Sequence, residues 1–124
     1  MTEYEILDLA MGHVNAAVDD LNRALALGSA YLLCAYKIGK ELTRFQVSII
    51  NIGFVVFVGQ AMHGAYIEHA ASTIYYGMVD TDAWAYTDIA QFSSSVNLIY
   101  STGALGAVFA CLAFMWSVRH PKVE

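Results

Sequence analysis

Apolar residues in this chain recur in long runs separated by short polar segments, a pattern typical of helical membrane proteins. The runs cover residues 23–38, 45–67 and 92–118. The last two rise about 34 and 40 Å as helices, enough to cross a hydrocarbon core roughly 30 Å thick. The first rises only about 24 Å, so Arg23 and Lys37 must extend their charged ends toward water. We therefore predict an all-α membrane protein with three transmembrane helices.

An amphipathic helix is predicted ahead of these spans, over residues 3–22. Thr2 and Glu5 have the spacing of a capping box, in which each side chain bonds the other residue's backbone amide. The segment has no basic residue before Arg23, unlike helices that lie on lipid surfaces. We expect its apolar side to pack on protein. The sequence leaves open whether this helix and the span at 23–38 form one continuous helix.

The charges divide the chain into two sides. The predicted loop at 68–91 has acidic residues but no Lys or Arg, whereas five of the six basic residues flank the opposite ends of the spans: Lys37, Lys40, Arg44, Arg119 and Lys122. Short loops rich in Lys and Arg stay in the cytoplasm. We therefore predict an N-terminus outside and a cytoplasmic tail at 119–124. The membrane is then a bacterial-type cytoplasmic (inner) membrane, or a virion membrane derived from it.

Size and composition exclude several classes of protein. A chain of 124 residues has room for one domain, and 58% hydrophobic residues exceed what a soluble domain of this size hides. The net charge of −5 argues against binding nucleic acid. Cys34 and Cys111 lie in apolar runs near the cytoplasmic ends, so we expect free thiols. We find no catalytic or cofactor motif and predict that the protein is not an enzyme and holds no cofactor.

The second span carries polar residues on one face of a helix. With two residues of the third span they form what we call the polar seam: Ser48, Asn51, Gln60, His63, Tyr66, Asn97 and Ser101. Polar groups are costly in lipid, so we expect the seam to face protein or water. The remaining face should meet lipid: Val47, Ile50, Phe54, Phe57, Ala61 and Ala65. Hydrogen bonds between helices explain the seam, and the functional alternative is a pore or small site.

His63 is the one residue of the seam with ligand chemistry. It is a weak candidate for haem binding, and His63, Glu68 and His69 are weak candidates for a metal site at the outer mouth. Their spacing matches no established ligand motif. We therefore expect His63 to form a hydrogen bond inside the bundle.

Small residues are predicted to mark helix contacts, because they let backbones approach closely. They are Gly28, Gly59, Gly103, Gly106 and Ala110. One three-helix chain cannot easily use all of these faces, so association is expected.

These observations predict a non-enzymatic small integral membrane subunit whose partners are the lipid bilayer and either further copies or other membrane subunits. It would pack into a homo-oligomer or a larger assembly, such as a respiratory-type complex or a virion membrane. Three spans with the N-terminus outside also resemble the layout of three-helix phage holins, and that resemblance implies a pore-forming oligomer as the alternative. A haem- or quinone-associated anchor that uses His63 is the second alternative.

Overall fold

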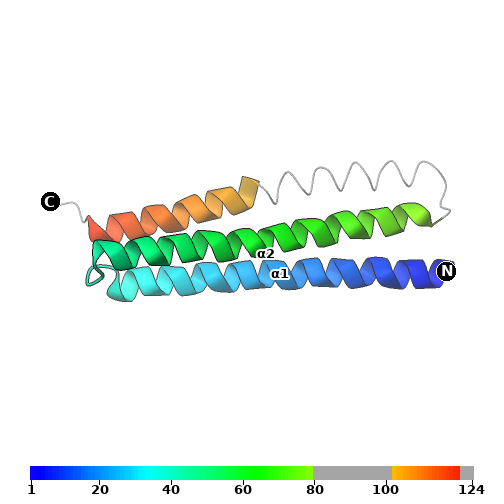
Figure 1. Ribbon diagram of the computed structural model, residues 1–124, viewed down its shortest axis with the longest axis horizontal. Helices are drawn as coiled ribbons and strands as arrows, with labels where there is room; N and C mark the ends of the chain where they lie inside the picture. Colours follow the sequence, from blue (N-terminus) through cyan, green and yellow to red (C-terminus); the bar gives the residue numbers. More distant parts are fainter. Residues whose placement is uncertain (80–101, 121–124) are drawn as a thin grey trace.

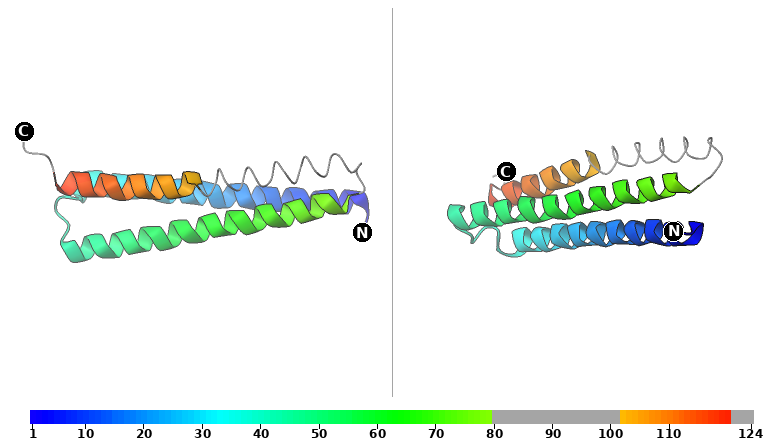
Figure 2. Two further views of the ribbon diagram at one scale, coloured as in Figure 1. Left: turned by 90° about the horizontal axis from the view of Figure 1, so that it is seen from above. Right: turned by 45° about the vertical axis from the view of Figure 1, so that its right-hand side comes forward.

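Two long helices and one shorter helix make up residues 1–79 and 102–120, which the computed structural model describes. Helix α1 covers Glu3–Ile38, α2 covers Arg44–Met78, and the C-terminal helix covers Thr102–Arg119. Helices α1 and α2 lie side by side and antiparallel, and the C-terminal helix lies along the end of this hairpin where α1 turns into α2 (Figures 1 and 2). The predicted all-α class is confirmed.

Helix α1 is one continuous helix, about 54 Å long at 1.5 Å per residue. The predicted capping box is present: the Glu5 backbone N–H donates to Thr2 Oγ1 at 3.3 Å, and the Thr2 N–H donates to Glu5 Oε2 at 2.7 Å. The amphipathic segment and the first apolar run therefore share one axis. The sequence left open whether these two segments form one helix, and the structure shows that they do.

Helix α2 starts with a second capping box, which our reading of the sequence missed. The Gln46 backbone N–H donates to Thr43 Oγ1 at 3.2 Å, and the Thr43 N–H donates to Gln46 Oε1 at 2.9 Å. The helix then continues to Met78, so the prediction of a loop from residue 68 is wrong for residues 68–78. This stretch stays helical because it packs on α1. Its own residue Ser72 is only 2% exposed. The rest of the predicted loop, and the start of the third span, lie outside the described residues.

Two of the described helices are long and apolar enough to cross a membrane, namely α2 and the C-terminal helix. Only 17% and 11% of their most apolar stretches are buried within the structure. A core helix of a soluble protein would be mostly buried. The membrane character of the chain is therefore supported at these two helices, whereas α1 does not meet the same criterion of length and composition.

A hydrophobic cluster contributed by all three helices lies in the half of the bundle next to the α1–α2 turn. Its buried members are Tyr31, Ala35, Phe54, Val58, Cys111 and Met115. Met115 is 1% exposed and enters this cluster from the C-terminal helix. Toward the other end, α1 and α2 meet through smaller residues: Ala10, Ala17, Ala61, Ala65 and Ser72.

Arg119 fastens the C-terminal helix to the turn between α1 and α2. Its Nη1 donates to the Leu42 backbone oxygen at 2.6 Å and to the Gly39 oxygen at 3.3 Å. These carbonyls follow the end of α1, where backbone oxygens have no partner within the helix. A guanidinium that donates to both carbonyl oxygens gives each of them a hydrogen-bond partner. It also holds the C-terminal helix against the turn.

We expect Arg119→Gln to lower the free energy of unfolding by about 1.5–3 kcal/mol, because hydrogen bonds to a charged group are lost. The measurement is chemical unfolding in mild detergent. Lys37→Gln is the control, because it removes the same charge from an exposed side chain at the same end. An equal loss in both variants would show that net charge, and not this contact, stabilises the end.

Candidate functional site

One polar contact links α1 and α2 inside the hydrophobic cluster. The Tyr31 hydroxyl donates to Asn51 Oδ1 at 2.7 Å, and the Tyr31 ring stacks on Phe54 with centroids 4.2 Å apart. Tyr31 is 4% exposed. A buried tyrosine hydroxyl needs a hydrogen-bond partner, and Asn51 of α2 supplies it here. Asn51 is thus a member of the predicted polar seam that forms a hydrogen bond between two helices of the bundle.

The other described members of the polar seam lie on the outside of the three helices. Gln60, His63 and Ser48 are exposed, and Tyr66 is 52% exposed. The Ser48 hydroxyl donates to the Arg44 carbonyl of its own helix at 3.0 Å. Asn97 and Ser101 lie outside the described residues. A role for this face in contacts with other molecules stays a prediction.

The predicted lipid-facing side of α2 is largely the buried side. Phe54, Ala61 and Ala65 are at most 9% exposed, whereas Phe57 is 59% exposed. Val47 and Ile50 also pack against the cluster. The expectation that these residues meet lipid is wrong for Phe54, Ala61 and Ala65, whereas Val47 and Ile50 remain partly exposed. Small apolar residues allow α1 to lie close to α2, so packing favours this face over the polar one.

Asp20 of α1 and Gly64 of α2 lie in direct contact between the two long helices. A Cβ atom on Gly64 would overlap the Asp20 carboxylate, so a larger residue there would require that side chain to shift. Asp20 Oδ1 accepts a bond from Arg23 Nη1 at 3.0 Å, and its side chain is 18% exposed. This largely covered carboxylate is thus paired. The sequence indicated no special role for Gly64, because a glycine in an apolar run has no visible partner.

The glycines that were predicted to mark contacts behave differently. A Cβ on Gly28, Gly59, Gly103 or Gly106 would meet nothing within 4 Å. Ala110 is exposed, as are all of these glycines except the half-buried Gly28. These positions are not close contacts within the described part of the chain.

Near the free ends of the hairpin, His13 joins α1 to α2. Its Nδ1 lies 2.5 Å from Glu68 Oε2, and its ring stacks on Tyr75 with centroids 5.2 Å apart and planes 11° from parallel. Each side chain of the His13–Glu68 pair is about one-third exposed. Such a pair aligns the helices and contributes modestly to stability.

The candidate metal ligands do not form a site in the part of the chain that is described. There, no three His, Cys, Asp or Glu side chains are placed to hold a metal ion. Glu68 is engaged by His13, while His63 is exposed on α2 and His120 stacks on Trp116 with centroids 4.1 Å apart. A second axial histidine for a haem on His63 would have to come from another molecule.

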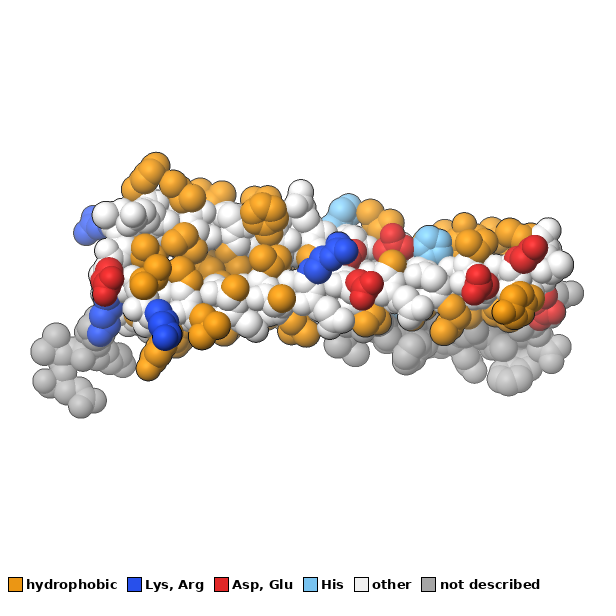
Figure 3. Space-filling model, turned by 90° about the horizontal axis from the view of Figure 1, so that it is seen from below, with side chains coloured by type: hydrophobic (Ala, Val, Ile, Leu, Met, Phe, Trp, Pro, Cys, Tyr) orange, Lys and Arg blue, Asp and Glu red, His pale blue; other side chains and the backbone are white. Residues whose placement is uncertain are grey.

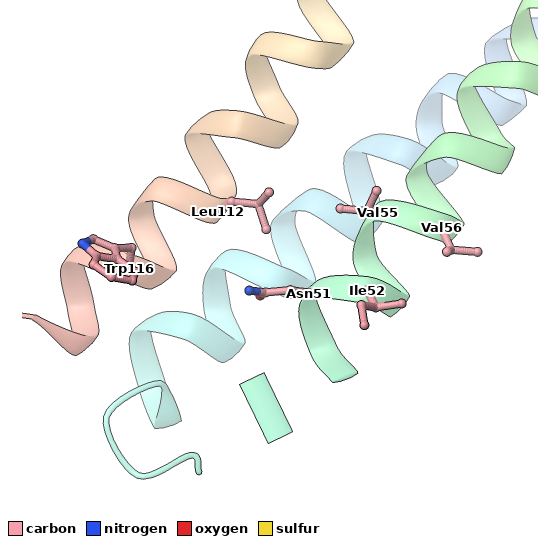
Figure 4. Close-up of a pocket in the computed structure, with 6 residues that line it drawn as sticks. All are labelled: Asn51, Ile52, Val55, Val56, Leu112 and Trp116. Atoms are coloured by element: carbon pink, nitrogen blue, oxygen red, sulfur yellow. The ribbon is translucent and has the colours of Figure 1, made fainter. Parts of the chain in front are cut away.

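A shallow groove opens between α2 and the C-terminal helix, with a volume of about 440 Å³. Its walls are Asn51, Ile52, Val55, Val56, Leu112 and Trp116. Figure 4 shows Asn51 and Leu112 pointing toward each other from the two sides. Five of the six lining side chains are hydrophobic, so the groove suits an apolar occupant.

Comparison with known proteins finds no matching family model, no similar curated protein and no similar solved structure. The function is therefore argued from the surfaces and contacts of this chain.

The burial of α2 predicts which phenylalanine matters. Phe54→Ala should lower the free energy of unfolding in detergent by about 3 kcal/mol, because it leaves a cavity beside Tyr31. Phe57→Ala, on the exposed side of the same helix, should change it by less than about 0.5 kcal/mol. Equal effects at the two positions would contradict the orientation of α2.

Proposed function

We propose that this chain is a small, non-enzymatic membrane protein that crosses the bilayer three times and functions by assembling with further copies or with other membrane subunits. The observation that carries the proposal is the surface of α2 and the C-terminal helix. It combines polar side chains and small residues on apolar helices, and the described part of the chain leaves it uncovered.

Charges define a slab of membrane thickness along the bundle. Helix α2 has no charged residue between Arg44 and Glu68, and Gly64, beside Asp20 of α1, lies about 30 Å from Arg44 at helical rise. This distance matches the hydrocarbon core of a bilayer. In the view of Figure 3, most of the basic side chains lie at the end with the α1–α2 turn, beside one acidic side chain, and the other acidic side chains and the visible histidines lie toward the opposite end. The bias supports a cytoplasmic turn and an outer N-terminus.

The short apolar run of α1 fits this placement through its partner helix. Tyr31 has its hydroxyl bonded to Asn51, so it presents no free polar group to lipid at this depth. Arg23 lies near the outer edge of the slab and bonds Asp20. These contacts support α1 as a span even though its composition alone is too polar.

Within the slab, the half of α2's uncovered side nearer the N-terminus of α1 carries polar side chains that are unsuited to lipid. Gln60 is exposed about 24 Å from Arg44, and His63 is exposed about one turn further out. Polar side chains in membrane spans normally face protein or a water-filled cavity. Exposed Gly59 and Gly106 add places where another helix can approach closely. Both features favour a protein neighbour at these faces.

A pore is the second candidate, and the same polar side of α2 favours it. In a ring of copies, Gln60 and His63 would line a water-filled channel from the outer mouth inward. Ion flux through vesicles that contain the purified chain separates this function from simple assembly.

The proposed orientation is tested with single cysteines at two exposed positions. An impermeant thiol reagent on intact cells should label Asp8→Cys strongly and Glu41→Cys only after lysis, since the turn faces the cytoplasm. The unmodified chain, with Cys34 and Cys111 at membrane depth, is the control. Strong labelling of Glu41→Cys in intact cells would overturn the orientation.

The proposed assembly is tested at a glycine. Gly106→Leu should weaken association by about tenfold, or roughly 1.4 kcal/mol, because a bulky side chain blocks close approach of a neighbour. Folding of the chain should be unaffected, since a Cβ there meets nothing within 4 Å. Cross-linking at graded protein-to-lipid ratios measures association, and Gly12→Leu, outside the slab, is the control. Unchanged cross-linking in Gly106→Leu and Gly59→Leu would contradict assembly through these faces.

A further inference from the structure

The groove between α2 and the C-terminal helix lies mostly in one half of the slab. Asn51 is about 10 Å and Val56 about 18 Å from Arg44 along the α2 axis. The groove therefore ends just past the middle of the slab, and most of it lies on the side that the proposed function assigns to the cytoplasm. A partner helix would need a groove that crosses the whole slab.

The charges at the end of the groove nearest the α1–α2 turn favour an anionic ligand. Arg44, Ser48 and Ile52 follow one another at intervals of four residues, so they share one face of α2 that leads into the groove. On the other wall, Trp116 stacks on His120. The remaining described charges at this end are Lys37, Lys40, Glu41 and Arg119. Basic groups outnumber the single carboxylate, so the end carries a net positive charge.

The one polar group that lines the groove adds a hydrogen-bond donor. Asn51 Oδ1 already accepts from Tyr31, and Asn51 Nδ2 has no protein partner among the described residues. A donor within an apolar groove suits a molecule with a carbonyl oxygen between a charged head and an apolar tail.

We propose that this groove binds an anionic phospholipid of the cytoplasmic leaflet. One acyl chain lies against Ile52, Val55 and Leu112, the ester carbonyl accepts from Asn51 Nδ2, and the phosphate contacts Arg44. The inference rests on the proposed membrane placement. A second copy is a poorer occupant of this groove, because a transmembrane helix packs along the whole slab and the groove covers only part of it.

Native mass spectrometry of the full chain, released from mild detergent, tests this proposal. The probes are phosphatidylglycerol and phosphatidylcholine with identical acyl chains. We expect one saturable phosphatidylglycerol per chain, bound about fivefold more tightly than phosphatidylcholine, the effect of one basic residue near an anionic headgroup.

Two variants and their matched controls locate the site. Ile52→Trp should abolish the saturable lipid by filling the groove, while Ile49→Trp, on an exposed residue of α2 outside the groove, should retain it. Arg44→Gln should remove the preference for phosphatidylglycerol, and Lys37→Gln should not.

Equal binding of both lipids would overturn the anionic site, and equal loss in Ile52→Trp and Ile49→Trp would overturn its location. Disulfide-linked dimers of Ile52→Cys would show that a second copy occupies the groove. The same spectra give the mass of the assembly. A monomer with saturable lipid therefore refutes self-association alone, whereas an oligomer without it refutes the lipid site alone.

Discussion

The close antiparallel contact of α1 with α2 determines where every other described feature lies. Small buried residues such as Ala17 and Ala65 bring the helices together, and the missing side chain of Gly64 makes room for Asp20. Once this register is set, Tyr31 lies opposite Asn51 and His13 lies opposite Glu68. Dispersion contacts between small residues, rather than polar bonds, thus select the packed face, as is usual where the surrounding solvent is itself apolar.

The basic side chains at the α1–α2 turn fall into two groups, one that holds the structure together and one that is exposed. Arg119 satisfies backbone carbonyls of the turn and holds the C-terminal helix against the cluster around Met115. Its neighbours Lys37, Lys40 and Arg44 are exposed. Structural and surface charges are therefore divided between different residues, so the end can be held together while positive charge remains for the membrane surface.

The exposed faces of α2 and the C-terminal helix are the surfaces that other molecules would contact. Packing uses the apolar side of α2 and leaves Gln60 and His63 outside, where lipid alone would be a poor neighbour. On the opposite half of the slab, the groove at Ile52 is apolar and lies near positive charge. In the proposed orientation, the two halves of one helix surface thus suit different neighbours, protein toward the outer side and lipid toward the cytoplasmic side.

The sequence by itself determined the helical class, the capping box at Thr2, and the charge division between the two ends, because these depend on local hydrogen bonds and on composition. It did not determine which face of α2 is buried. Hydropathy separates apolar from polar positions, but protein and lipid are both apolar, so Phe54 and Phe57 look alike in the sequence. The sequence pattern also predicted that the second span ends at residue 67, which is too early. The helix continues through Ser72 because it packs on α1 there. The register of Asp20 on Gly64 and the bond from Tyr31 to Asn51 were decided by the tertiary structure, because each needs two residues that are distant along the chain.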